Sequence, residues 1–70
     1  MNAEPWLDAY ASKLGIAPPT DDELETLLAL AGVAAHSSER KAAPIACWLT
    51  ARAGVEPAEA MRLAQELSDG

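Results

Sequence analysis

Apolar residues recur along the chain with the spacing of an α-helix in four separate stretches. They follow each other three or four positions apart across residues 6–14, 24–35, 45–49 and 60–67, the spacing that places side chains on one helix face. No stretch alternates apolar and polar residues as a half-buried strand does. The pattern predicts an all-α fold, a compact bundle of four short helices forming one domain over residues 1–70.

Residues typical of helix ends separate these stretches. Pro5 and Pro57 suit the first turn of a helix, where a missing N–H leaves no hydrogen bond unmade. Gly15 and Gly54 suit the left-handed conformation that ends a helix. Thr20-Asp21-Asp22-Glu23 matches a capping box, in which Thr20 and Glu23 bond each other's backbone N–H groups. Capping therefore explains these acidic residues without a catalytic role.

The second helix is predicted over residues 21–36, and the stretch 34–45 joins it to the third. Pro44 cannot lie deep inside a helix, because it lacks an N–H and its ring clashes with the preceding turn. Two geometries satisfy this: a third helix that begins at Pro44, or a kinked continuation from Ser38. Gly32, inside the second helix, lowers helix propensity, and we expect it to allow a close approach of another helix.

Few large side chains are available to form a core. The candidates are Trp6, Leu7, Tyr10, Leu14, Leu24, Leu27, Leu28, Ile45, Trp48, Leu49, Met61 and Leu67. The aromatic face of the first helix suits either core packing or a partner. Leu30 and Val33 fall beside the main apolar stripe of the second helix, so they either extend the buried face or leave an exposed patch. With Trp48, they form a candidate interface.

The charge and the single cysteine exclude several functions. The net charge is −6 and no basic face is evident, which argues against nucleic-acid binding because phosphate contacts need cations. The longest apolar run, Leu27 to Ala35, is too short for a membrane span and no signal peptide is evident. We therefore expect a cytoplasmic protein. Cys47 is the only cysteine, so no intrachain disulfide forms and no metal or cofactor site is expected.

His36, Arg40, Lys41 and Pro44 form the strongest candidate site. A helix that begins at Pro44 would present open N–H groups beside these cations, which suits a phosphate or carboxylate. Alternatively, Arg40 and Lys41 pair with the chain's own acids, such as Glu39, on a solvated surface. No catalytic residue is identified, because His36 has no evident partner for acid–base chemistry, and we expect a protein that is not an enzyme.

Short motifs resemble a small bacterial helical domain of unknown function. They are Trp6-Leu7-Asp8, Ala35-His36, Glu39-Arg40, Ala43-Pro44 and Ala53-Gly54, with the acidic second helix between them. That domain occurs alone or appended to proteins that resemble molybdenum cofactor guanylyltransferases. The resemblance implies an accessory role near molybdopterin or nucleotide metabolism, with a nucleotidyltransferase as a partner. It assigns no catalytic residue.

The sequence thus predicts a non-enzymatic accessory or protein-interaction module that receives an anion near residues 36–44. One alternative is a structural homodimer joined through Leu30, Val33 and Trp48. A weaker one is a helix-turn-helix regulator that reads DNA with its third helix. The apolar residues of that helix and the negative charge of the chain argue against it.

Overall fold

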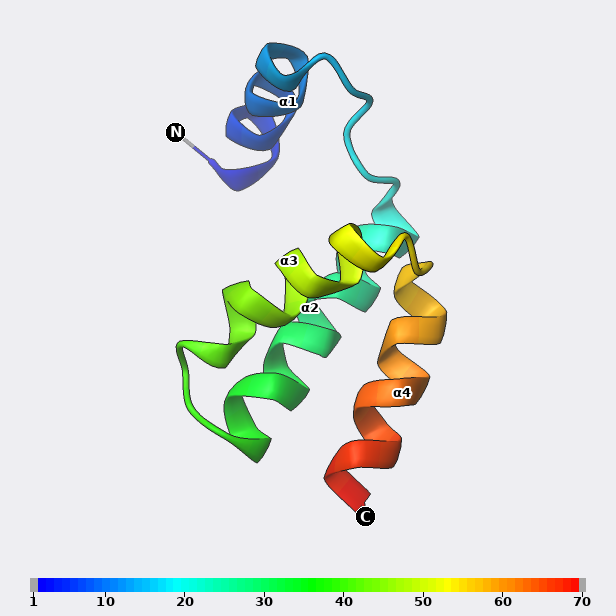
Figure 1. Ribbon diagram of the computed structural model, residues 1–70. Helices are drawn as coiled ribbons and strands as arrows, with labels where there is room; N and C mark the ends of the chain where they lie inside the picture. The colour runs from blue at the N-terminus through cyan, green and yellow to red at the C-terminus, as the bar shows by residue number, and fades with distance from the viewer. Residues whose placement is uncertain (1, 70) are drawn as a thin grey trace.

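Four α-helices make up the fold, and the prediction of an all-α bundle of four short helices is confirmed. The computed structural model describes residues 2–69 and contains α1 (Ala3–Leu14), α2 (Asp21–Ser37), α3 (Ala42–Ala53) and α4 (Pro57–Asp69), as Figure 1 shows. Within residues 2–69, no helix has the length and apolar character that crossing a lipid bilayer requires.

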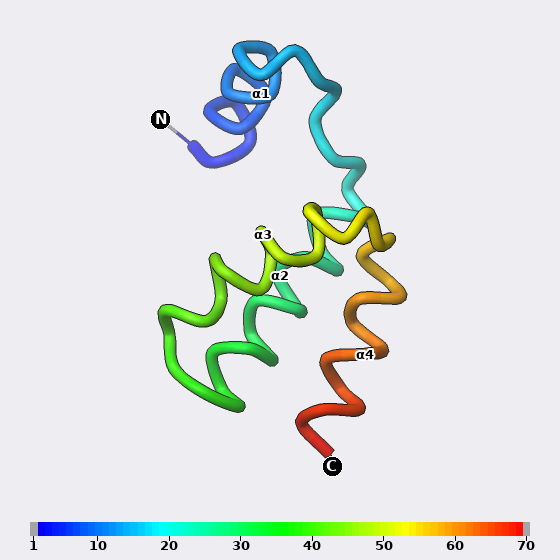
Figure 2. Tube along the Cα trace, in the orientation of Figure 1, coloured from blue at the N-terminus to red at the C-terminus, as the bar shows by residue number. Residues whose placement is uncertain are grey.

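Helix α2 is the centre of a three-helix body. It packs against both α3 and α4, and these two helices diverge from the short loop that joins them (Figures 1 and 2). Helix α1 stands off this body, beyond the end at which α2 begins, and residues 16–20 connect the two. The molecule is consequently elongated, with extents of 38 × 23 × 19 Å.

The helix ends lie close to where the local signals predict them. Thr20 Oγ1 accepts the Glu23 N–H at 3.1 Å, and the Glu23 carboxylate accepts the Thr20 N–H at 2.8 Å. This capping box fixes the start of α2. Gly15 and Gly54 have φ values of 79° and 70° and end α1 and α3. Both predicted glycine caps are therefore confirmed.

The chain breaks between α2 and α3, so the kinked continuation is wrong. Helix α3 begins at Ala42, earlier than the Pro44 start predicted from sequence. The reason is a turn over residues 39–43, in which the Ala42 and Ala43 N–H groups donate to the Glu39 and Arg40 carbonyls at 2.9 and 3.1 Å. Pro44 then occupies the first turn of α3, where no N–H is required.

The buried core is smaller than the sequence suggests. Among residues 2–69, only Leu30, Ala11 and Ala60 are buried, and Leu30 is 2% exposed. The predicted core residues that are instead exposed are Trp6, Tyr10, Leu14, Leu28, Ile45, Trp48, Leu49 and Leu67. On α1 this follows from the lack of extensive packing against another helix, and for Ile45, Leu49 and Leu67 it follows from the divergence of α3 and α4.

Gly32 does not serve a close helix approach, contrary to expectation. A Cβ atom built at this position meets no atom within 4 Å apart from its chain neighbours and the backbone of its own helix. Alanine loses less backbone entropy than glycine on entering a helix, so Gly32→Ala is expected to stabilise the protein by about 0.5–1 kcal/mol. Thermal unfolding of both proteins at one concentration measures the difference. A lower melting temperature for the variant would contradict the open space around residue 32.

Candidate functional site

An apolar groove lies between α3 and α4, with α2 as its floor. Its larger part has a volume of about 480 Å³, and a part of about 260 Å³ continues it toward Val55. The two parts share Leu30, Ala46, Leu49 and Ala64. Alanines at facing positions leave the space open, because each fills less volume than the leucines beside it. We call this feature the apolar groove.

The groove walls expose large aliphatic side chains to solvent. Ile45 and Leu49 on α3 and Leu67 on α4 line the larger part and are 57, 56 and 84% exposed. At its far end Ser68 Oγ donates to the Ala64 carbonyl at 2.9 Å and accepts from Ser37 Oγ at 2.7 Å. These hydroxyls tie the end of α2 to the end of α4. The groove is therefore closed by polar atoms at one end and apolar along its length.

The predicted cationic cluster lies beside this same end of the groove. His36 is in the last turn of α2, Arg40 and Lys41 are in the turn before α3, and Pro44 is in the first turn of α3. All four are exposed. Ser37, Ser38 and Ala42, which line the groove, are their neighbours in the chain. The structure thus brings the cluster and the groove together.

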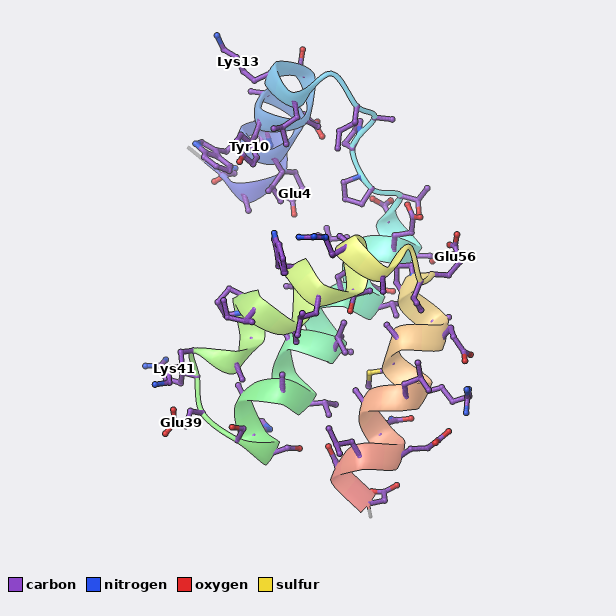
Figure 3. All side chains as sticks on the ribbon, in the orientation of Figure 1. Glu4, Tyr10, Lys13, Glu39, Lys41 and Glu56 are labelled. Carbon is purple, nitrogen blue, oxygen red and sulfur yellow. The ribbon has the colours of Figure 1, made fainter. Side chains whose placement is uncertain are left out.

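Arg40 and Lys41 differ in their pairing. Lys41 Nζ lies 3.4 Å from Glu39 Oε2, and both side chains are exposed; Figure 3 shows them at the outer edge of the turn. Within residues 2–69, Arg40 forms no ion pair. The alternative in which the cations pair with an acid of the same turn therefore holds for Lys41. The Arg40 guanidinium stays available to pair with a ligand or a partner.

The first two amides of α3 are not open, although sequence reasoning predicts an open helix start in this region. The Ala42 and Ala43 N–H groups already donate to carbonyls of the preceding turn, and Pro44 has no N–H. The expectation is wrong for these two amides, because the turn satisfies donors that a helix start usually leaves open. An anion at this turn would be held by side chains, with Arg40 as the main donor.

The three candidate interface residues do not share a surface. Leu30 is the most buried residue of the described chain and forms the floor of the groove, where Val33 lies half-buried beside it. Trp48 is 56% exposed and does not line the groove. Its ring lies 5.2 Å from the Arg52 guanidinium, a cation–π arrangement.

Ion pairs occupy the exposed face of α4. Arg62 Nε donates to Glu59 Oε2 at 2.9 Å, and the guanidinium also pairs with Glu66. The hydrogen bond from Arg62 lowers the pKa of Glu59, and the same bond raises the pKa of Arg62. Since all three side chains are exposed, this network serves mainly to pair charges along the helix.

Metal-binding side chains are not clustered in the part of the chain that the structure describes. No three His, Cys, Asp or Glu residues of positions 2–69 gather where they could hold an ion. Cys47 lies half-buried on α3 with a free thiol. The groove and the neighbouring turn are therefore the features on which a functional interpretation rests.

Sequence reasoning found the cationic cluster but missed the groove. One available signal was that no charged residue separates Lys41 from Arg52, so α3 is apolar on more than one face. A single neighbouring helix cannot cover such a surface. The excess apolar area of α3 therefore pointed to a groove or an interface.

The comparison with known proteins gives a match to one family over almost the whole chain. The family is described as a domain of unknown function (DUF6457), and its model matches residues 1–69. No curated protein and no solved structure matches the chain. The resemblance to a small domain of unknown function is confirmed at that level.

Proposed function

Because the chain belongs to the DUF6457 family, whose description assigns no role, we propose a function from its own surfaces. The protein is a non-enzymatic interaction module whose apolar groove receives an amphipathic helix of a partner protein. The observation that carries this proposal is the open groove of about 480 Å³ with Ile45, Leu49 and Leu67 exposed along its walls. Continuous exposed apolar surface of this kind marks interaction sites.

The shape of the groove favours a helix as the bound element. Two diverging helices over a third leave a channel into which the apolar face of a helix fits, as in other helix-in-groove complexes. Channel walls of small alanines and larger aliphatic residues give the ridges and grooves that helix packing uses. An extended peptide that binds by adding a strand would instead need an exposed sheet edge, and residues 2–69 contain no strand.

Arg40 adds charge recognition at one end of the groove. The guanidinium forms no ion pair within residues 2–69, and a carboxylate can accept two of its hydrogen bonds at once. A partner helix with an acidic residue beside its apolar face would therefore be oriented by Arg40. This retains the anion-receiving role of the turn, with a side chain in place of backbone amides.

The identity of the partner follows from the resemblance rather than from the geometry. Domains of the resembled kind occur beside proteins like molybdenum cofactor guanylyltransferases, so we propose a bacterial accessory protein whose partner is such a nucleotidyltransferase. The absence of catalysis is part of the same proposal. His36 is exposed at the end of α2, outside the groove lining.

The test compares partner capture by three variants with capture by the wild type. Leu49→Glu places an unpaired charge in the groove, so it is expected to weaken binding more than about tenfold. Arg40→Ala removes the proposed exposed ion pair with an acidic residue of the partner, so it should weaken partner binding up to about fivefold. Arg52→Ala removes the same charge from α3 at a position outside the groove lining and serves as the matched control. The dissociation constant of the captured protein for each purified variant gives the measurement.

The outcome is decisive in both directions, because Leu49 and Arg40 are exposed and their replacement should leave the circular dichroism spectrum unchanged. Equal affinity of all four proteins for the captured partner would reject the groove. Loss of affinity in Leu49→Glu alone would retain the groove and remove Arg40 from the site.

A further inference from the structure

Helix α1 presents an aromatic face that the other helices of residues 2–69 do not cover. Trp6 and Tyr10 stack with ring centroids 5.1 Å apart and an interplanar angle of 29°, and both are 50% exposed. Leu14, one turn further on, is exposed as well. Helix α1 does not pack extensively against any other helix of residues 2–69. The chain therefore carries an uncovered apolar helix as well as an uncovered groove.

The linker fixes α1 away from its own groove. Gly15 is left-handed, and the Ile16 N–H donates to the Ala11 carbonyl at 3.0 Å, which sets the direction in which the chain leaves α1. Ala17 and Pro18 each precede a proline, which confines both to extended conformations. Thr20 is held by the capping box. Local conformation thus holds α1 apart from the body, as Figure 1 shows.

The charges beside the aromatic face of α1 are complementary to the two walls of the groove. At 100° per residue, Glu4 and Asp8 fall on one flank of the apolar stripe and Lys13 falls on the other. Beside the α3 wall, Arg40 forms no ion pair within residues 2–69, and no acid lies between positions 40 and 53. The segment 55–69, which forms the other wall, carries four acids, of which Glu59 and Glu66 pair with Arg62. In one of the two directions that a helix can take in the groove, α1 would place its acids toward α3 and Lys13 toward α4.

The length and the exposed apolar area of α1 also suit binding in the groove. Helices α1 and α3 each have 12 residues and are therefore about 18 Å long. An aromatic side chain buries about 150–250 Å² when fully covered, so the two half-exposed rings have a similar total area left to bury. A matching area of groove doubles this value, and exchange in both directions doubles it again, to about 600–1,000 Å². With Leu14 and Ile16 added, reciprocal exchange reaches the size of a stable interface, whereas a single contact does not.

We infer that two copies of this chain exchange their first helices, with α1 of each copy lying in the apolar groove of the other. The inference rests on the proposed function of the groove as a helix-binding surface and names its occupant. Exchange of an identical element is a low-cost route to a dimer, since no surface beyond those already present is required. An outside partner would then compete with α1 of the second copy.

Sedimentation equilibrium of the full chain over a wide concentration range tests the exchange. The wild type is expected to form dimers. Trp6→Ala and Leu49→Glu, which alter the helix and the groove separately, should each raise the dimer dissociation constant about 30-fold or more. Mixing these two variants restores one intact contact, so the mixture should associate more tightly than either variant alone. Leu28→Ala, at an exposed position outside the groove, is the control that leaves the constant unchanged.

Charge reversal tests the orientation of α1 in the groove. Arg40→Glu places an acid on the α3 wall and should weaken the dimer, and Glu4→Lys in the same chain should restore part of the lost affinity. A dimer insensitive to both Leu49→Glu and Trp6→Ala would overturn the inference. A wild type that remains monomeric at every concentration would also overturn it. If the Trp6 fluorescence of such a monomer, measured in the Trp48→Phe background, shows a buried indole, α1 is covered within its own chain. In those cases the proposed function stands or falls separately, by the affinity of the captured partner for Leu49→Glu.

Discussion

Leu30→Ala is expected to lower the free energy of unfolding by about 2–5 kcal/mol, the largest effect of any single truncation in this chain. Leu30 is 2% exposed and supports both parts of the groove, so its loss removes the contact that α3 and α4 share over α2. A chain of this length is stabilised by about 4–10 kcal/mol in total. Much of the protein should therefore unfold, as urea titration followed by circular dichroism would show.

Leu28→Ala is the matched control for this prediction. It makes the same chemical change on the same helix, but Leu28 is 65% exposed, so the expected change stays within about 0.5 kcal/mol. All proteins are compared at one concentration, because self-association adds to apparent stability. Equal effects of the two substitutions would mean that α2 buries a different face from the one described.

Gly54→Ala is expected to lower the free energy of unfolding by about 1–2 kcal/mol. Gly54 has φ 70°, a left-handed conformation that a Cβ atom disfavours. The Gly54 and Val55 N–H groups donate to the Ala51 and Thr50 carbonyls at 3.1 and 3.3 Å, so the same residue ends α3 and sets the direction of α4. In a domain of this size each kcal/mol lowers the melting temperature by about 4–8 °C, which calorimetry measures readily.

Gly54→Asn distinguishes the strain of the left-handed backbone from any other effect of replacing Gly54. Asparagine adopts the left-handed conformation more readily than alanine does, so its melting temperature should lie between those of Gly54→Ala and the wild type. An asparagine variant as unstable as the alanine variant would show that the cost arises elsewhere. Gly32→Ala, with the opposite expected sign, completes the comparison.

Local features of this fold could be predicted because they depend on a few adjacent residues. The capping box at Thr20 and Glu23 and the left-handed glycines at 15 and 54 follow from backbone hydrogen bonds within one turn. The break before Pro44 is equally local. Its exact position could not be predicted, because the hydrogen bonds of the turn, from the Ala42 and Ala43 N–H groups to the Glu39 and Arg40 carbonyls, involve backbone atoms alone.

The distribution of buried residues could not be predicted, because it depends on where helices meet. Leu28 and Leu30 are the same residue type on one helix, yet one is exposed and the other is the centre of the body. An alanine-rich helix leaves the buried face poorly defined, since small residues fit either surface. The groove could not be predicted either, because it also depends on where the helices meet. The cationic cluster could be predicted, because its residues are close together in the chain.

The contact between the end of α2 and the end of α4 determines when this chain can fold during synthesis. Ser37 and Ser68 are 31 residues apart, and the helix that contains Ser68 leaves the ribosome after α2 and α3. Helix α1 emerges before α2 but adds no extensive packing, and α3 covers only part of α2, so the apolar face of α2 is covered in full only by α4. Until α4 has emerged, the rest of that face is available to chaperones and to neighbouring nascent chains.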